Sequence, residues 1–300
     1  MKKTLCASIA MCFAALCWGQ LPQVASVERV ALPGGTDVSM AALSPDGSYA
    51  VVSPLSGVGL SKLDFATSEI TEISKTASPL LLDFTADSRN VIFRESSYDK
   101  NHRRLVALKS YDVSAKKIQT IVEPTRRLQG FAADGTTAVA VDNGRMRSKA
   151  IGQKTPVTRA VLSIDLGKLC VTRNGRTEAI APLGDRCNSY LWPSLSPDGK
   201  RIVAFGVGTG AFTCNLDGSD VRLLGMYRAP KWLDNNVIVA MDDHDNGVVT
   251  VRSAIMAIAA DGSDKVALTA DSVVAVFPSV AKNKVGFTTP QGEFYIINLK

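Results

Sequence analysis

A short turn motif recurs along this chain and constrains its fold more than any other feature. The motif places a polar residue and an Asp-Gly pair between two apolar runs, and it is clearest as Ser196-Pro197-Asp198-Gly199 within YLWPSLSPDGKRIVAF, residues 190–205. It returns as Ser44-Pro45-Asp46-Gly47, and in degenerate form around Asp87, Asp134, Asp234 and Asn283. Successive motifs are 41, 47, 64, 36 and 49 residues apart. A strand–turn–strand unit that repeats about every 45 residues is typical of a β-propeller blade.

The residue types in this motif suit a tight hairpin. An aspartate side chain accepts hydrogen bonds from nearby backbone N–H groups, and glycine adopts a positive φ without steric cost. The runs that follow the turns, such as 49–52 and 202–205, are almost wholly apolar, as expected of strands packed on both faces between blades. We therefore predict structural turn roles for four residues: Asp46, Gly47, Asp198 and Gly199.

A second series of turns runs in phase with the first. It is clearest at Asp217-Gly218 and Asp261-Gly262, and it continues around Asp64, Asp112 and Asn174. Because such aspartates recur in every blade, we interpret them as structural turn residues rather than as a catalytic carboxylate pair. The two series together predict that each blade is a four-stranded antiparallel meander.

The spacing and the chain ends predict how many blades there are and how the ring closes. The expected mature chain, residues 20–300, holds six blades at about 47 residues each. The last blade has three strands before the sequence ends, and the segment Val27–Leu32 precedes the first blade without a blade of its own. Pairing Val27–Leu32 with 293–298 would remove exposed sheet edges. The prediction is an all-β, six-bladed propeller, closed by the N-terminal strand that completes the last blade.

The region between Asp142 and Arg159 does not follow the repeat. It contains Gly, Lys and Arg without a clear strand pattern, and an additional apolar run follows at 160–166. We interpret residues 142–158 as an insertion in the third blade. A seventh blade would require a further turn motif of the same kind in this region.

The first nineteen residues predict a secretory signal peptide. A Lys2-Lys3 pair precedes an apolar stretch at 5–16, which is too short to anchor stably in a bilayer. A lipoprotein anchor at Cys17 is disfavoured because Ala-Ala-Leu precedes it, where a small residue is usual. We therefore expect a periplasmic or secreted propeller domain over residues 20–300.

Three of the six cysteines would remain after cleavage: Cys170, Cys187 and Cys214. Cys170 and Cys187 could bridge a modest loop in an oxidising compartment, or all three could stay free. Cys214 lies in an apolar run and is expected to be a small buried hydrophobe. The formal net charge of +6 includes Lys2 and Lys3 and is spread along the chain, so we expect no nucleic-acid partner and at most a weak preference for acidic ones.

The densest polar cluster is Asp242-Asp243-His244-Asp245-Asn246-Gly247. We interpret it as a solvated hairpin loop, and the alternative is a calcium site formed by Asp242, Asp243 and Asp245. The aromatic residues Trp192 and Phe277 stand six residues before their turns. They are expected to fill gaps between blades or, alternatively, to project into the central funnel and contact a ligand.

The segments YLWPSLSPDGKRIVAF (190–205) and NLDGSDVRLL (215–224) resemble the WD40-like repeat of TolB-type β-propellers. The resemblance extends over residues 24–300, and its motifs are most specific in the first and fourth predicted blades. It implies an exported, soluble propeller that binds proteins or small ligands through its loops and central funnel. The chain departs from TolB because no N-terminal α/β domain precedes the first strand, so the partners of TolB are not carried over.

We expect a non-catalytic propeller that binds another envelope protein, a peptide or a surface ligand, as a monomer or within a complex. The sequence shows no G-x-S-x-G nucleophile elbow and only two histidines. Two alternatives remain open at this point. One is a propeller hydrolase or lyase with a funnel active site, and the other is a propeller stabilised by calcium.

Overall fold

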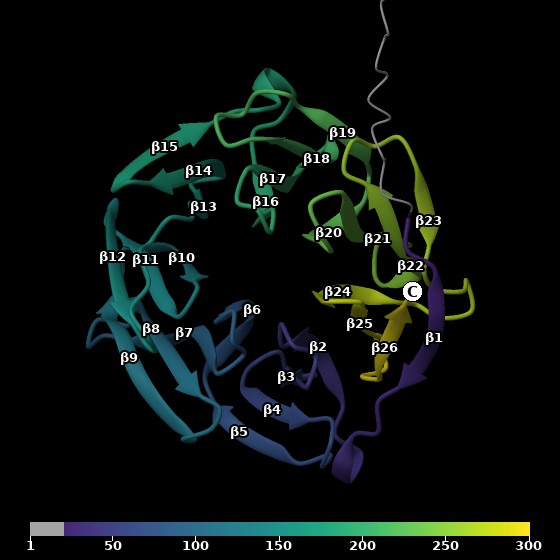
Figure 1. Ribbon diagram of the computed structural model, residues 1–300, viewed down its shortest axis with the longest axis horizontal. Helices are drawn as coiled ribbons and strands as arrows, with labels where there is room; N and C mark the ends of the chain where they lie inside the picture. Colours follow the sequence, from purple (N-terminus) through teal and green to yellow (C-terminus); the bar gives the residue numbers. More distant parts are fainter. Residues whose placement is uncertain (1–20) are drawn as a thin grey trace, which may run out of the picture.

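The apolar runs that follow the turn motifs form inner strands of seven antiparallel sheets in the computed structural model, which describes residues 21–300. The sheets stand as blades around a central axis, and the chain passes from blade to blade around the ring (Figure 1). Within each blade the strands follow one another outward from the axis.

Blades 1, 2, 5 and 6 are complete four-stranded meanders. Blade 1 consists of β2 (Val38–Leu43), β3 (Tyr49–Pro54), β4 (Leu60–Asp64) and β5 (Ile70–Ser74), and blade 2 of β6 (Ala77–Phe84), β7 (Asn90–Tyr98), β8 (Arg104–Asp112) and β9 (Lys117–Thr125). Blade 5 consists of β16 (Tyr190–Leu195), β17 (Arg201–Gly206), β18 (Gly210–Asn215) and β19 (Arg222–Gly225), and blade 6 of β20 (Arg228–Trp232), β21 (Val237–Asp245), β22 (Thr250–Ala259) and β23 (Lys265–Ala267).

The other three blades differ from this plan. Blades 3 and 4 have three strands each, and blade 7 takes its fourth strand from the beginning of the chain. Blade 3 consists of β10 (Leu128–Asp134), β11 (Thr137–Asp142) and β12 (Arg145–Ala150), and blade 4 of β13 (Val161–Asp165), β14 (Lys168–Arg173) and β15 (Arg176–Ile180). Blade 7 consists of β24 (Val276–Ala281), β25 (Lys284–Thr288) and β26 (Phe294–Leu299) together with β1 (Val24–Arg29). Two short 3₁₀ turns lie at Pro33–Gly35 and Gly184–Arg186.

The prediction of six blades is wrong, and the error lies between Asp142 and Arg159. The segment interpreted as an insertion contains β12, the outer strand of blade 3, and the run at 160–166 is the inner strand of a separate blade. The β12 strand has the sequence RMRSKA and is mostly exposed. An outer strand of this kind needs no apolar run, because only its inner neighbour β11 is fully buried.

The missing turn motif is present in another chemical form. Asn143 and Gly144 have φ of 54° and 71°, and Leu166 and Gly167 have φ of 48° and 80°. Two consecutive residues with positive φ form a two-residue hairpin, for which Asn-Gly is among the strongest sequence signals. The turns that define the extra blade therefore use Asn-Gly and Leu-Gly in place of Asp-Gly.

Blade 3 reverses the direction in which the next inner strand runs along the axis, and blade 4 reverses it back. The Gln129 side chain, near the start of β10, donates from Nε2 to Asp165 Oδ2 at the end of β13, at 3.1 Å. Asp134, at the end of β10, accepts from the backbone N–H of Arg159, just before β13, at 2.8 Å. The inner strands β10 and β13 therefore run in opposite directions. A blade with an odd number of strands leaves the chain at the opposite face of the propeller. The second three-stranded blade therefore restores the original strand direction for β16.

The prediction that the N-terminal strand closes the ring is confirmed. β1 pairs antiparallel with β26, with Val27 opposite Ile297 and Glu28 opposite Ile296 (Figure 1). The strand nevertheless lies three residues earlier than predicted, over Val24–Arg29. Val30 and Leu32 were expected in it, but these side chains pack beyond its end against the core between blades 7 and 1.

Between residues 21 and 300, no helix is long and apolar enough to cross a membrane. The predicted signal peptide, residues 1–19, and its cysteines Cys6, Cys12 and Cys17 lie outside the described residues.

Candidate functional site

The inner strands enclose a hollow along the axis of the ring. A cavity of about 410 Å³ lies between the inner strands of blades 2 to 6, and two adjoining cavities of about 350 and 280 Å³ share Asp83 and Lys231 with it. We call this continuous space the central channel. A volume of this size suits a small ligand or a short segment of a partner chain.

Two aromatic side chains reach the central channel because the strands that carry them are bulged. Trp192 in β16 and Phe277 in β24 have φ of 49° and 52°, and each directly precedes a proline. The pairing register shifts at both places. A bulge redirects a side chain, and a positive φ is strained for a bulky residue. Both residues line the channel, and both also pack against the core cluster of blades 6 and 7. The structure therefore agrees with both expectations, that they fill gaps between blades and that they project into the funnel.

The charged groups of the central channel are mostly cationic. Arg94, Arg159 and Lys231 line it, and Asp83 is the anionic residue beside them. The Arg94 side chain donates from Nη2 to Gln129 O at 2.9 Å and lies over the Phe131 ring, 5.2 Å from its centroid. These contacts fix the guanidinium against blade 3 and leave its other donors available.

Arg159 and Asp83 are held by backbone groups of neighbouring blades. Arg159 Nη2 donates to Ser196 O at 3.2 Å, which links blade 4 to the first turn of blade 5. The Asp83 carboxylate accepts from the backbone N–H of Ala133 and of Phe84, both at 2.8 Å. The channel wall is therefore built from side chains with fixed positions.

Three buried donor groups of the same wall have no hydrogen-bond partner in the described part of the chain. They are Nε of Arg94, Nε of Arg159 and Oγ of Ser163. Ser163 is only 5% exposed, and all three residues line the 410 Å³ cavity. A buried donor without a partner costs about 1–3 kcal/mol. Three such groups around one cavity indicate a place where an acceptor can be bound.

Burial perturbs the ionisation of these groups. It lowers the pKa of Arg94 to about 10, with a contribution from the positive charge of Arg104. It also raises the pKa of Asp83 and lowers the pKa of Lys231, while the attraction between the two opposes both shifts. Titratable groups that are perturbed by desolvation in a cleft are candidates for function.

The predicted turn residues lie at the hairpins, outside the wall of the cavity. Ser196 Oγ donates to Asp198 Oδ1 at 2.7 Å, and the backbone N–H of Lys200 donates to the same oxygen at 3.1 Å. Asp46 makes the equivalent bonds, and Asp217 and Asp261 each accept from the following serine. Four glycines adopt positive φ beside them: Gly47, Gly199, Gly218 and Gly262.

The calcium candidates do not converge. Asp242, Asp243 and Asp245 lie in β21 of blade 6, where adjacent residues point to opposite faces of the sheet. Asp243 pairs with Arg228 Nη1 at 2.8 Å, and Asp245 accepts from the backbone N–H of Gly247 at 2.9 Å. No group of three or more potential metal ligands occurs within residues 21–300.

The three described cysteines are buried free thiols. Cys187 and Cys214 pack in one core cluster with Leu169 and Val171, whereas Cys170 lies between those two residues in β14 and faces the other side of the sheet. The structure therefore contains no Cys170–Cys187 bridge. Burial raises the pKa of Cys214 to about 12, in agreement with the expected role as a small hydrophobe.

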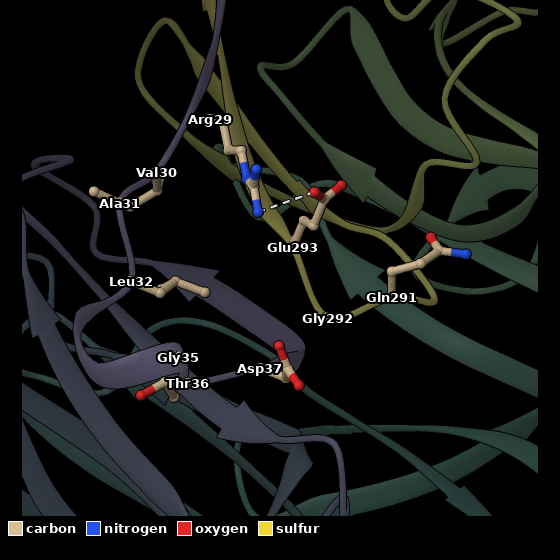
Figure 2. A pocket seen from close by; sticks show the side chains of 10 residues that line it. All are labelled: Arg29, Val30, Ala31, Leu32, Gly35, Thr36, Asp37, Gln291, Gly292 and Glu293. Carbon is tan, nitrogen blue, oxygen red and sulfur yellow. Dashed lines mark ion pairs between the residues drawn. The ribbon is translucent and has the colours of Figure 1, made fainter.

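A second hollow lies at the outer edge of the ring, where the chain leaves β1 for blade 1 (Figure 2). Arg29 and Glu293 in its wall already pair with each other, since Arg29 Nη2 lies 3.0 Å from Glu293 Oε1, and the Tyr295 hydroxyl donates to Glu293 at 3.1 Å. Asp37 lines the same hollow. This groove reflects the closure of the ring, and the central channel is the stronger candidate site.

The sequence analysis did not identify the charged residues of the central channel. Asp83 and Lys231 stand inside the inner-strand segments LLLDF and RAPKW, where an apolar residue is the norm. A charged residue inside such a segment is the signal that could have identified them. Ser163 and Arg94 carry no comparable signal, because their place in the channel depends on how blades 2, 3 and 4 pack.

Comparison with known proteins supports the fold. No protein-family model matches the chain, and no curated protein matches its sequence. Among solved structures, U3-55K is similar with a TM-score of 0.59 at 9% identity, covering 92% of this chain and 99% of that one. The putative TolB from Agrobacterium tumefaciens is similar with a TM-score of 0.53 at 14% identity, covering 88% and 91%.

The propeller domain of Cps50 (Swd1) from Myceliophteria thermophila is similar with a TM-score of 0.58 at 10% identity, covering 93% of this chain and 100% of that domain. The resemblance to TolB-type propellers is therefore confirmed at the level of the fold. At these identities the likeness extends no further than the fold.

Proposed function

We propose that this protein is an exported, non-catalytic binding module that holds another envelope protein, a peptide or a surface ligand at its central channel. The observation that carries the proposal is the set of unpartnered donors around one cavity, Arg94 Nε, Arg159 Nε and Ser163 Oγ. A propeller closed by its own N-terminal strand presents such a site on a rigid frame, so little ordering free energy is lost on binding.

Site-specific photo-crosslinking in intact cells tests this proposal. A photoreactive residue replaces Leu191, which is 38% exposed and lines the cavity, and a matched control replaces Val248, which is 89% exposed on the β21–β22 hairpin. We expect a discrete adduct from position 191 that is absent from position 248. Equal adducts from both positions, or none from position 191, would contradict binding at the channel.

The same cell fractions test the proposed location. We expect the full-length protein, expressed in a bacterial host with an outer membrane, to appear in the periplasmic or secreted fraction in a shortened form. A full-length product that stays in the cytosol would contradict export.

One observation favours a second candidate, a hydrolase or lyase with a funnel active site. Asp83 on β6 and Lys231 on β20 face the same channel, and burial shifts the pKa of each toward the neutral form. Groups of this kind serve in acid–base catalysis. The variants Asp83→Asn and Lys231→Met separate the two functions. A catalytic role predicts bound ligand that is no longer converted, whereas a binding role predicts only a change in affinity.

A further inference from the structure

The arrangement of charge in the central channel points to the chemistry of its ligand. Three cationic side chains, Arg94, Arg159 and Lys231, share the wall with the single carboxylate of Asp83. With all four ionised, the wall carries an excess of two positive charges. A low-dielectric channel strengthens the attraction of such charges for an anion.

The unpartnered donors lie beside a close contact between blades 3 and 4. Arg94 Nη2 donates to Gln129 O, and a Cβ added to the next residue, Gly130, would lie 2.8 Å from Ser163 Cβ. Both the Arg94 guanidinium and the Ser163 hydroxyl are therefore held near the Gln129–Gly130 segment of β10. A guanidinium and a hydroxyl that line one cavity form a donor set suited to the oxygens of a carboxylate or phosphate.

Part of the cavity wall is apolar and aromatic. Phe131, Leu162 and Trp192 line the same space as the donors. Phe131 already lies beneath the Arg94 guanidinium, and Trp192 packs edge-on against Phe205 with ring centroids 5.5 Å apart. The site therefore offers fixed aromatic surface next to fixed donors.

We propose that the central channel binds an oxyanion attached to an apolar or aromatic body, with Arg94 and Ser163 donating to the oxyanion and Trp192 contacting the apolar part. Arg159 lies toward the opposite end of the cavity, next to Ser196, and attracts the ligand by its charge. This inference rests on the proposed binding function, and it adds the chemical class of the ligand.

The source of the oxyanion is either a free small acid or the terminal carboxylate of a partner chain. N-acetyl-phenylalanine represents the shared chemistry, and its amide is the matched neutral control. The peptide acetyl-Ala-Ala-Ala-Phe with a free carboxylate distinguishes the two sources. If it binds as tightly as the short acid, the channel accepts a chain terminus, whereas loss of binding on extension assigns the site to a free small molecule.

Binding to the purified protein is measured by titration calorimetry and by tryptophan fluorescence, because Trp192 and Trp232 both line the channel. We expect the acid to bind about tenfold or more tightly than the amide, since a hydrogen bond to a charged group is worth that much. Salt should weaken binding of the acid.

Variants identify the residues that act. Arg94→Met keeps the apolar stem and removes the guanidinium, Ser163→Ala removes the unpartnered hydroxyl, and Arg145→Met on the outer strand β12 is the matched control. We expect the first two to reduce the affinity for the acid by about tenfold and about threefold, respectively, without changing the affinity for the amide. The control variant should bind as the unaltered protein does. Thermal melting of each variant shows whether it is folded, and Ser163→Ala tests the site even if Arg94→Met fails to fold.

Equal binding of acid and amide, or no binding of either, would overturn the oxyanion site. Inorganic phosphate that binds as tightly as the acid would overturn the role of the apolar wall. These results would not affect the crosslinking experiment. An adduct from position 191 would still support binding at the channel. An unchanged affinity in both folded variants would remove Arg94 and Ser163 from the site.

Discussion

The close approach of Gly130 and Ser163 shows how single residues set the shape of the central channel. A Cβ on Gly130 would lie 2.8 Å from Ser163 Cβ and 3.0 Å from Leu162 O. Only glycine allows β10 and the oppositely directed β13 to approach this closely. The contact also places the Ser163 hydroxyl at the cavity wall, where it has no partner among the described residues.

Gly130→Ala should therefore destabilise the fold. Overpacking of this kind typically costs about 1–3 kcal/mol in the free energy of unfolding. The loss should be smaller in a Ser163→Gly background, because the nearest clashing atom is then absent. Denaturant unfolding of the two single variants and the double variant measures both quantities. If the costs of the two substitutions simply add, the close contact is not what makes Gly130 necessary.

At the scale of the element, the Ser-Pro-Asp-Gly hairpin is a self-contained unit of hydrogen bonding. Ser196 Oγ donates to Asp198 Oδ1 and accepts from the backbone N–H of Arg201 at 2.9 Å, while the Gly199 N–H donates to Ser196 O at 2.9 Å. The bond from Ser196 above all, together with that from the backbone N–H of Lys200, holds the pKa of Asp198 below its ordinary value. Hydrogen bonds from Ser219 do the same for Asp217.

The hairpin carboxylates should make the stability of the fold depend on pH in the acidic range. A carboxyl with a lowered folded-state pKa stabilises the fold when ionised. That contribution is fully present above the ordinary aspartate pKa of about 3.9 and is lost as the pH falls through the lower folded-state value. The variant Asp198→Asn should therefore lose less stability than the unaltered protein between pH 5 and pH 2.5, by roughly 0.5 kcal/mol after allowance for solvent screening.

Unfolding at the two pH values measures the difference. Asp185→Asn, at an exposed aspartate of the 3₁₀ turn Gly184–Arg186, is the control substitution and should leave the pH dependence unchanged. A variant Asp198→Asn that follows the unaltered protein at both pH values would show that the hairpin carboxylate contributes nothing to acid stability.

At the scale of the whole molecule, stability depends on closing the ring. β1 and β26 join the two ends of the described chain through pairs such as Val27 with Ile297, and the backbone N–H of Val30 donates to Phe294 O at 2.8 Å. Each blade packs only on its neighbours, so an opening at one place exposes two blade faces and a free strand edge.

Removal of β1 should lower the stability of the entire ring. We compare a chain that begins at Leu21 with one that begins at Val30, which lacks the strand. The shorter chain should melt roughly 10 °C lower, and protection from hydrogen exchange should fall across blades 7 and 1 and beyond. Equal melting temperatures for the two chains would show that the pairing of β1 with β26 does not hold the propeller together.

The sequence by itself determined the fold class, the hairpin turns and the way in which the ring closes. These features depend on short-range chemistry: Asp-Gly and Asn-Gly pairs close tight turns in which the glycine takes a positive φ, and apolar runs between them must be buried. A spare strand at one terminus and an incomplete blade at the other are also visible in the order of the apolar runs.

Only the tertiary structure decided the number of blades and the content of the central channel. The strand β12 is solvent-exposed and carries no apolar pattern, so its existence depends on pairing with β11. The channel brings together Asp83, Arg94, Ser163 and Lys231 from three different blades. Their proximity follows from the direction in which each inner strand runs and from where it bulges, and both are consequences of how the whole ring packs.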